Sequence, residues 1–199
     1  MTLIEHFEEL RNRLFIALGA WIVGSGVAFA FRFELLDWLH QPLPENLNLA
    51  AFGLFEPFLV SMQVASFFGL VLAAPIVGGQ VWGFVAPGLY PEERRWAVPF
   101  ILLTAVAFAD GVLFSRYVVL PFSVAITVRF LGADVNVIPS VGDYVSKVVT
   151  IMAVFGLLFE MPVVGFLLAR IGILNHTFMA EKRRWAVVIG LVLAAVITP

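Results

Sequence analysis

Long stretches without a charged residue constrain this chain more than any other feature of its sequence. The longest runs from Pro57 to Pro91 without a single Asp, Glu, Lys or Arg. As one helix with a rise of about 1.5 Å per residue it would be roughly 50 Å long, whereas the hydrocarbon core of a bilayer is about 30 Å thick. Such a helix must tilt, bend at Pro75 or leave the bilayer at one end.

Five long apolar stretches, two of which contain a single acidic residue, predict five transmembrane helices. Their approximate bounds are 14–31, 60–82, 96–115, 148–169 and 185–198. The composition agrees, because 61% of the 199 residues are hydrophobic, whereas a soluble domain is usually about half apolar. We therefore predict an all-α polytopic membrane protein with a single domain over residues 1–199. The apolar stretch 117–128 is too short to span, and is either a bent continuation of the third helix or a helix at the membrane surface.

Several functional classes are excluded by what the sequence lacks. It has no cysteine, so it offers neither a disulfide nor a thiolate metal site. A net charge of −2 gives no indication of nucleic-acid binding. The sequence contains neither a His-Glu-x-x-His nor a Gly-x-Ser-x-Gly pattern, so we predict no enzyme, no metal and no cofactor. The first twelve residues carry three glutamates where a cleavable signal peptide would be basic, so none is expected.

The distribution of Lys and Arg predicts the orientation in the membrane. With a cytoplasmic N-terminus, the basic residues on the inside are Arg11, Arg13, Arg94, Arg95, Arg170, Lys182, Arg183 and Arg184, and those on the outside are Arg32, Arg116, Arg129 and Lys147. The positive-inside rule favours this arrangement. The loops 32–56 and 116–147 then lie outside and are large enough to form a cap, the first with a short amphipathic helix at 35–39. Residues 2–14 predict a separate amphipathic helix that lies on the inner surface and runs into the first span.

A few acidic residues are candidates for function. Glu9 and Arg13 have the i,i+4 spacing of a helical ion pair. Asp110 and Glu160 lie within predicted spans, where a charge costs about 2.5–3.5 kcal/mol. We expect Asp110 to be protonated or paired inside the bundle, with Arg116 nearby. Glu160 has no cationic partner in the other spans. It is either protonated and inert in a tight bundle, or it faces a wetted concave surface beside a kink at Pro162.

Four groups of residues, in order along the chain, resemble the TatC family, the large membrane subunit of the twin-arginine protein translocase. The first group is His6-Phe7-Glu8-Glu9-Leu10-Arg11-Asn12-Arg13-Leu14. The second is Phe84-Val85-Ala86-Pro87-Gly88-Leu89-Tyr90 followed by Glu93-Arg94-Arg95. The others are Phe155-Gly156 with Phe159-Glu160-Met161-Pro162, and Ile197-Thr198-Pro199. Together they cover the whole chain and fit the predicted topology.

The resemblance implies a receptor for twin-arginine signal peptides and a scaffold subunit. Its translocase would export folded proteins across the cytoplasmic (inner) membrane, driven by the proton-motive force. A concave, glove-like bundle is expected in an oligomeric complex with TatA- and TatB-like single-span subunits. The signal peptide would bind at Glu9 and Glu93, together with Arg11 and Glu92, because two arginines require two carboxylates. Glu160 would contact a partner within the membrane. The matching structural positions are Pro42, Phe84, Pro87 and Pro162.

Two points depart from this picture. The family has six spans and a cytoplasmic C-terminus, whereas five spans are predicted here, so we expect a truncated or fused form. The alternative function is a proton-coupled secondary transporter of a small solute, with Glu160 and Asp110 as a proton relay. The absence of an internal sequence repeat counts against a transporter.

Overall fold

The computed structural model describes residues 3–44, 47–88, 97–130 and 138–170, and the single positions 184 and 188. Over these residues the fold consists of helices and connecting loops, with one isolated bridge between Ala50 and Ser140. The elements are α1 (Leu3–Ala30), α2 (Arg32–His40), α3 (Glu56–Val85), η1 (Ala86–Gly88), α4 (Ala97–Phe114), the π-helical turn η3 (Ser115–Val119), α5 (Leu120–Phe130) and α6 (Val141–Arg170).

Four stretches in the described part of the chain are long and apolar enough to cross a membrane. They are Ile4–Ala30, Glu56–Val85, Ala97–Phe130 and Val141–Ala169. They overlap the first four predicted spans, whose limits within the membrane stay predictions. Each of these stretches is longer than the predicted span that it overlaps, because helix ends that emerge from the hydrocarbon can carry charged residues. The predicted fifth span, 185–198, lies outside the described residues apart from Val188.

The N-terminal helix runs into the first predicted span, as expected, but it is not a separate element. Leu3 to Ala30 form one uninterrupted helix, and no Gly or Pro occurs between Leu3 and Leu14 to end it. A continuous helix cannot lie along the membrane surface and then turn across it. The amphipathic start of the chain is therefore the first part of α1 itself.

The stretch 117–128 is the continuation of the third helix, one of the two predicted alternatives. The chain passes from α4 through η3 into α5 without leaving the helical conformation. In η3 the N–H of Leu120 donates to the carbonyl of Ser115, which widens the helix just before Pro121. Proline is tolerated there because it falls in the first turn of the following helix.

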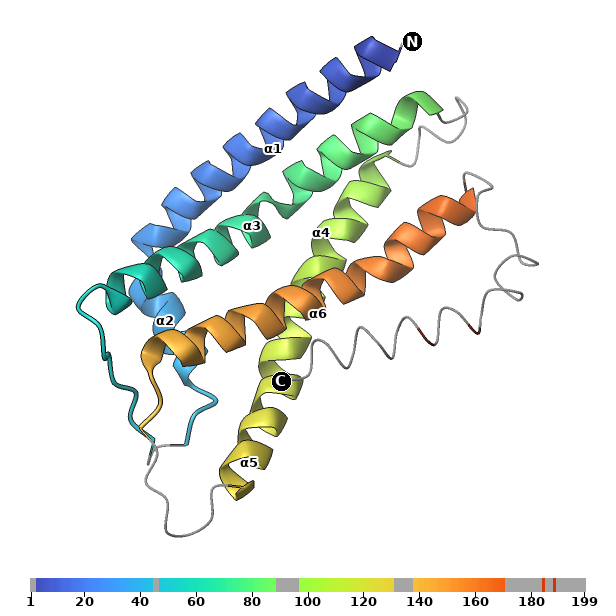
Figure 1. Cartoon of the computed structure of the whole chain (residues 1–199). Coiled ribbons are helices and arrows are strands. Elements are labelled where there is room, and N and C mark those ends of the chain that lie inside the picture. The colour runs from blue at the N-terminus through green and yellow to red at the C-terminus, as the bar shows by residue number, and fades with distance from the viewer. Residues whose placement is uncertain are drawn as a thin grey trace.

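α3 is the central helix of the bundle. It packs against α1, α2, α4 and α6, and α4 packs against α6. α1 and α3 run antiparallel, so the start of α1 lies beside the end of α3 (Figure 1). We call this the N-terminal end of the bundle. The opposite end, the α2 end, holds α2 and the first turns of α3 and α6 (Figure 1).

Glycines allow two pairs of helices to approach closely. A Cβ atom added to Gly24 of α1 would lie 3.3 Å from the Cα of Gly69 in α3. A Cβ atom on Gly111 of α4 would lie 2.8 Å from the Cα of Gly156 in α6. Helices in lipid associate largely through close packing, since there is no water for the interface to expel. These glycines therefore determine which face of each helix is turned towards its neighbour.

The α2 end is held together by Glu56, at the start of α3. Its carboxylate accepts hydrogen bonds from the backbone N–H of Phe52 at 2.7 Å, of Gly53 at 3.0 Å and of Gly142 at 2.7 Å, and from the hydroxyl of Ser140. Because Gly142 lies in the first turn of α6 and Ser140 directly precedes that helix, one carboxylate fixes the entry of two long helices. Sequence reasoning did not identify this residue, since an acid at a helix start is common.

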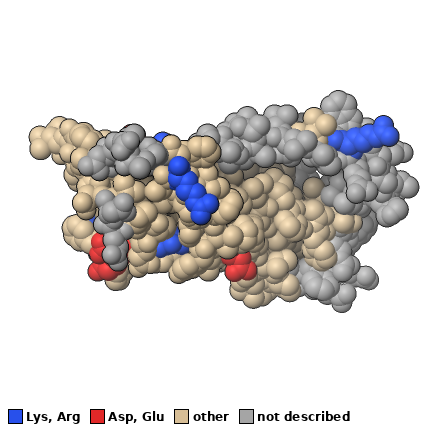
Figure 2. All heavy atoms as spheres, turned by 90° about the horizontal axis from the view of Figure 1, so that it is seen from below, with Lys and Arg blue, Asp and Glu red and all other residues tan. Residues whose placement is uncertain are grey.

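The predicted amphipathic helix in the first loop is confirmed as α2. Its Leu39 is fully buried and packs in a core with Val64, Val145 and Met152. Arg116 is only 3% exposed, and its guanidinium donates to the carbonyl of Trp38 at 2.6 and 3.1 Å. In the view from below, the charged side chains of the described residues are few and separated on a largely uncharged surface (Figure 2).

Candidate functional site

The N-terminal end of the bundle brings together the first two motifs found in the sequence. The ring of His6 in α1 stacks on the ring of Phe84 in α3, with centroids 4.4 Å apart and planes 19° apart. Gly83 lies against Arg13 so closely that a Cβ at Gly83 would overlap the guanidinium. The motif at 6–14 and the start of the motif at 84–95 therefore form one surface, although they are about 75 residues apart in sequence.

The predicted ion pair between Glu9 and Arg13 is confirmed. Oε1 of Glu9 accepts hydrogen bonds from Nη2 of Arg13 at 2.6 Å and from its Nε at 3.0 Å. The side chains are 20% and 28% exposed, so the pair is partly shielded from water. Oε2 of Glu9 is buried and has no hydrogen-bond partner among the described residues, and Nδ1 of His6 is 4.0 Å away. Among the described residues, Oε1 of Glu9 is therefore bonded to the guanidinium of Arg13, while Oε2 can still accept a hydrogen bond.

The other predicted signal-peptide residues are placed only in part. Arg11 is exposed on α1, and because it is two residues after Glu9 it projects from nearly the opposite side of the helix. Pro87 is exposed in η1. Glu92 and Glu93 lie outside the described residues, a few positions after η1. The predicted pairing of Glu9 with Glu93 therefore stays a prediction.

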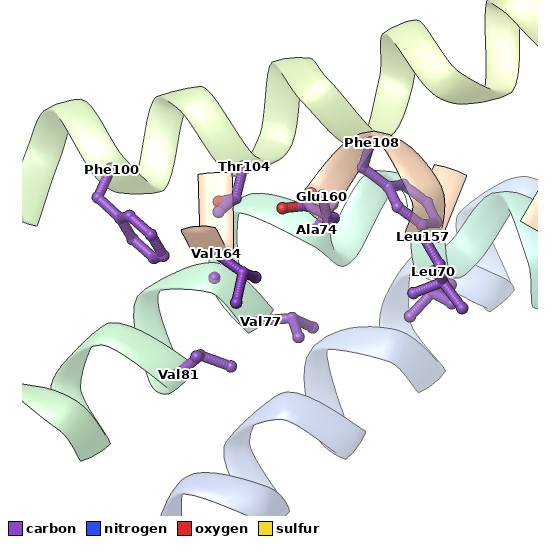
Figure 3. A pocket seen from close by; sticks show the side chains of 11 residues that line it. Leu70, Ala74, Val77, Val81, Phe100, Thr104, Phe108, Leu157, Glu160 and Val164 are labelled. Carbon is purple, nitrogen blue, oxygen red and sulfur yellow. The ribbon is translucent and has the colours of Figure 1, made fainter. Parts of the chain in front are cut away.

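A second candidate region is a pocket of about 280 Å³ between α3, α4 and α6. Glu160 of α6 is half-buried and extends into this pocket, as Figure 3 shows. The other lining residues are apolar except for Thr104; they are Leu70, Ala74, Val77, Gly78, Val81, Phe100, Phe108, Leu157 and Val164. The carboxyl forms no ion pair or hydrogen bond within the described part of the chain. The carboxyl of Glu160 is thus a polar group in a pocket whose lining is almost entirely apolar.

Thr104 was not singled out from the sequence, because a threonine in an apolar run carries no signal of its own. Its hydroxyl donates to the carbonyl of Ile101 at 2.9 Å and extends, like the carboxyl of Glu160, into the space beside α3 (Figure 3). A Cβ on Gly78 would lie 2.5 Å from that hydroxyl oxygen. The glycine therefore makes room for the only hydroxyl that lines this pocket.

The expectation for Asp110 is wrong. Its side chain is exposed on α4 and is not among the residues that line the pocket of Glu160. Arg116, its expected neighbour, is instead buried against α2 and also donates to Oε1 of Gln41 at 3.1 Å. The reason is helical phase: Gly111 must face α6, which turns the preceding residue outwards. Asp110 and Glu160 thus do not form the relay that a transporter would need.

The structural prolines lie in different settings. Pro42 is half-buried in the turn that follows α2, and Pro162 is exposed within α6. The helix continues from Val141 to Arg170 despite Pro162, so this proline does not end it. Because Pro162 has no N–H, the carbonyl of Leu158, two residues before Glu160, lacks its usual helical donor.

Comparison with proteins of similar sequence and structure identifies the family of this chain. The model of the family described as Sec-independent protein translocase protein (TatC) matches residues 5–199. The chain belongs to the TatC family. This confirms the resemblance found in the sequence, and it makes the chain a membrane component of the Sec-independent, twin-arginine protein translocase. None of these similarities supports the transporter alternative.

Curated TatC relatives align over nearly the whole chain. The TatC protein of Deinococcus radiodurans is 40% identical, and the alignment covers 99% of this chain and 76% of the relative. TatCy of Bacillus subtilis is 38% identical over 100% of this chain and 79% of its own length. A crystal structure of the twin-arginine translocase receptor TatC in DDM superimposes with a TM-score of 0.88 at 32% identity, covering 98% of this chain and 88% of that one. The predicted all-α fold is thus confirmed as that of TatC.

Proposed function

We propose that this TatC-family chain is the receptor for twin-arginine signal peptides and the scaffold on which the rest of the translocase assembles. The observation that carries the proposal is the carboxylate of Glu9, which is held by Arg13 on one oxygen and has no hydrogen-bond partner among the described residues on the other. A similar solved structure is named as a twin-arginine translocase receptor. An arginine of the peptide carries the same group that Arg13 already presents to Glu9.

The proposed mechanism is an exchange of one guanidinium for another. A planar guanidinium can donate two parallel hydrogen bonds to one carboxylate, which a lysine ammonium cannot match. Arg13 orients Glu9 while the site is empty, and the stacked ring of His6 shields its second oxygen. The incoming peptide displaces His6 or Arg13, and Glu93 receives the second arginine of the pair.

Loss of the two acids should weaken signal-peptide binding strongly. Replacing Glu9 or Glu93 by alanine removes charge-assisted hydrogen bonds that contribute about 1.5–3 kcal/mol, which corresponds to an affinity loss of about tenfold to a hundredfold. The measurement is binding of a fluorescent twin-arginine peptide to the purified protein in detergent. Glu8→Ala is the matched control, because Glu8 is exposed on the same turn of α1.

A twin-lysine peptide provides the second control. Wild-type protein should discriminate the two peptides, and the Glu9→Ala Glu93→Ala protein should not. If the double variant bound the twin-arginine peptide with unchanged affinity, the assignment of these carboxylates would be wrong.

The proposal also covers the membrane in which the chain lies, its orientation and its partner subunits. The chain lies in the cytoplasmic membrane with its N-terminus inside, works with TatA- and TatB-like single-span subunits, and uses the proton-motive force. Glu160 is the contact for a polar side chain of one of these subunits. The pocket between α3, α4 and α6 supports this role, because it is large enough to admit a side chain and contains no described partner for the carboxyl.

The orientation can be tested with single cysteines, since the natural sequence has none. Asn12 is exposed in the first half of α1, and Asn48 is exposed in the loop between α2 and α3. A cysteine at position 12 should react with a membrane-impermeant maleimide only from the cytoplasmic side, and one at position 48 only from outside. The reverse labelling pattern would refute the proposed orientation.

A further inference from the structure

The outward face of α4 carries a polar group for which the TatC function described above has no use. Asp110 is exposed, about 20 Å along the helix from Ala97, and makes no hydrogen bond or ion pair within the described residues. A carboxyl that faces lipid at this depth is unfavourable by a few kcal/mol. Polar groups in spans normally face the bundle interior or a partner, so an outward acid requires an explanation.

The residues around Asp110 have the spacing of a helix–helix interface. Leu103, Val106, Asp110 and Leu113 alternate in steps of three and four; we call this row the α4 seam. Its apolar members Leu103, Val106 and Leu113 are 46%, 54% and 44% exposed. The residues of α4 that face the bundle, such as Thr104, Phe108 and Gly111, lie on the opposite side of the helix. Heptad spacing with one polar residue at its centre fixes the register of a packed helix pair.

We propose that the α4 seam binds a transmembrane helix of another subunit that carries a basic or amide side chain at the depth of Asp110. The seam is apolar except at its centre, so its occupant must be apolar except at the matching position. The carboxyl of Asp110 accepts hydrogen bonds, so that position must donate them. This interface is separate from both Glu9 and the pocket of Glu160, and does not depend on either.

The occupant is a different subunit rather than a second copy of this chain. A second copy would have to supply the donor from one of its own spans. Near the middle of the described spans no Lys, Arg, Asn or Gln is exposed. Arg116 is 3% exposed and is already bonded to α2. Two copies meeting at their seams would instead place two Asp110 carboxyls against each other.

The test uses two synthetic transmembrane peptides, a 21-residue Leu/Ala helix with a central Asn and the same helix with a central Leu. The full chain is placed in phosphatidylethanolamine and phosphatidylglycerol vesicles with a fluorophore on Leu102→Cys, beside the seam, or on Ile22→Cys of α1 as the control position. Both side chains are exposed, at 59% and 68%. Energy transfer to labelled peptide then reports binding at each helix.

The Asn peptide should bind near Leu102 about threefold to tenfold more tightly than the Leu peptide, with no such difference at Ile22. The preference should persist in Asp110→Asn, which keeps an acceptor oxygen, and vanish in Asp110→Leu and in Asp110→Ala. Thermal unfolding of each variant confirms that it is folded. Absence of a preference in the unmodified chain, or its survival in both apolar variants, would overturn the proposal. So would energy transfer between two copies that depends on Asp110 while neither peptide is preferred.

Discussion

Glu160→Leu is expected to abolish transport while the protein still folds and still binds signal peptide. The side chain is half-buried in a pocket lined almost entirely by apolar residues, so leucine is compatible with the packing of α3, α4 and α6. What is lost is the hydrogen-bonding group that we propose meets the partner subunit. Because its environment excludes most water, loss of this contact should reduce export of a twin-arginine substrate to background in a vesicle transport assay.

Two further variants separate the carboxyl from the shape of the pocket. Glu160→Gln keeps most of the hydrogen-bonding capacity and should retain most of the transport. Leu157→Met changes the lining of the same pocket at nearly constant volume and should transport normally. Transport by Glu160→Leu at the normal rate would show that the carboxyl has no role in the partner contact.

Gly111→Leu should destabilise the protein strongly, because it disrupts the contact between α4 and α6. A Cβ at this position would lie 2.8 Å from the Cα of Gly156 and 2.9 Å from the carbonyl carbon of Phe155. These are backbone atoms of α6, which cannot rotate away, so α4 and α6 must separate. Overpacking typically costs about 1–3 kcal/mol, and occasionally more, so a fall in Tm of about 5–10 °C is expected in detergent.

The matched control is Gly19→Leu in α1, where an added Cβ would meet nothing within 4 Å. Its Tm should stay within about 2 °C of the unmodified protein, since leucine favours the helix more than glycine. Gly111→Leu should also impair transport, because α4 and α6 carry two walls of the pocket around Glu160. Equal Tm values for the two variants would show that the α4–α6 contact does not limit stability.

Much of the architecture could be predicted from the sequence, because few backbone conformations are stable inside a lipid bilayer. A long uncharged stretch must form a helix, since an unpaired backbone group in hydrocarbon is too costly. This reasoning located four long apolar helices in the described part of the chain, the short helix α2 and the i,i+4 pair of Glu9 and Arg13. The motifs at 6–14 and 84–95 also predicted a common site, and the contact of His6 with Phe84 shows that their described parts do meet.

What the sequence by itself determined was therefore which residues are helical and which of them carry polar chemistry. Only the tertiary structure decided the direction in which each polar side chain points. A span that is apolar all round has no preferred face of its own, so the pattern of hydrophobic residues cannot fix its rotation. The rotation is decided by close contacts between backbones, such as Gly111 against Gly156 and Gly24 against Gly69. Those contacts turn Glu160 and Thr104 into the pocket, place Arg116 against α2, and leave Asp110 facing outwards.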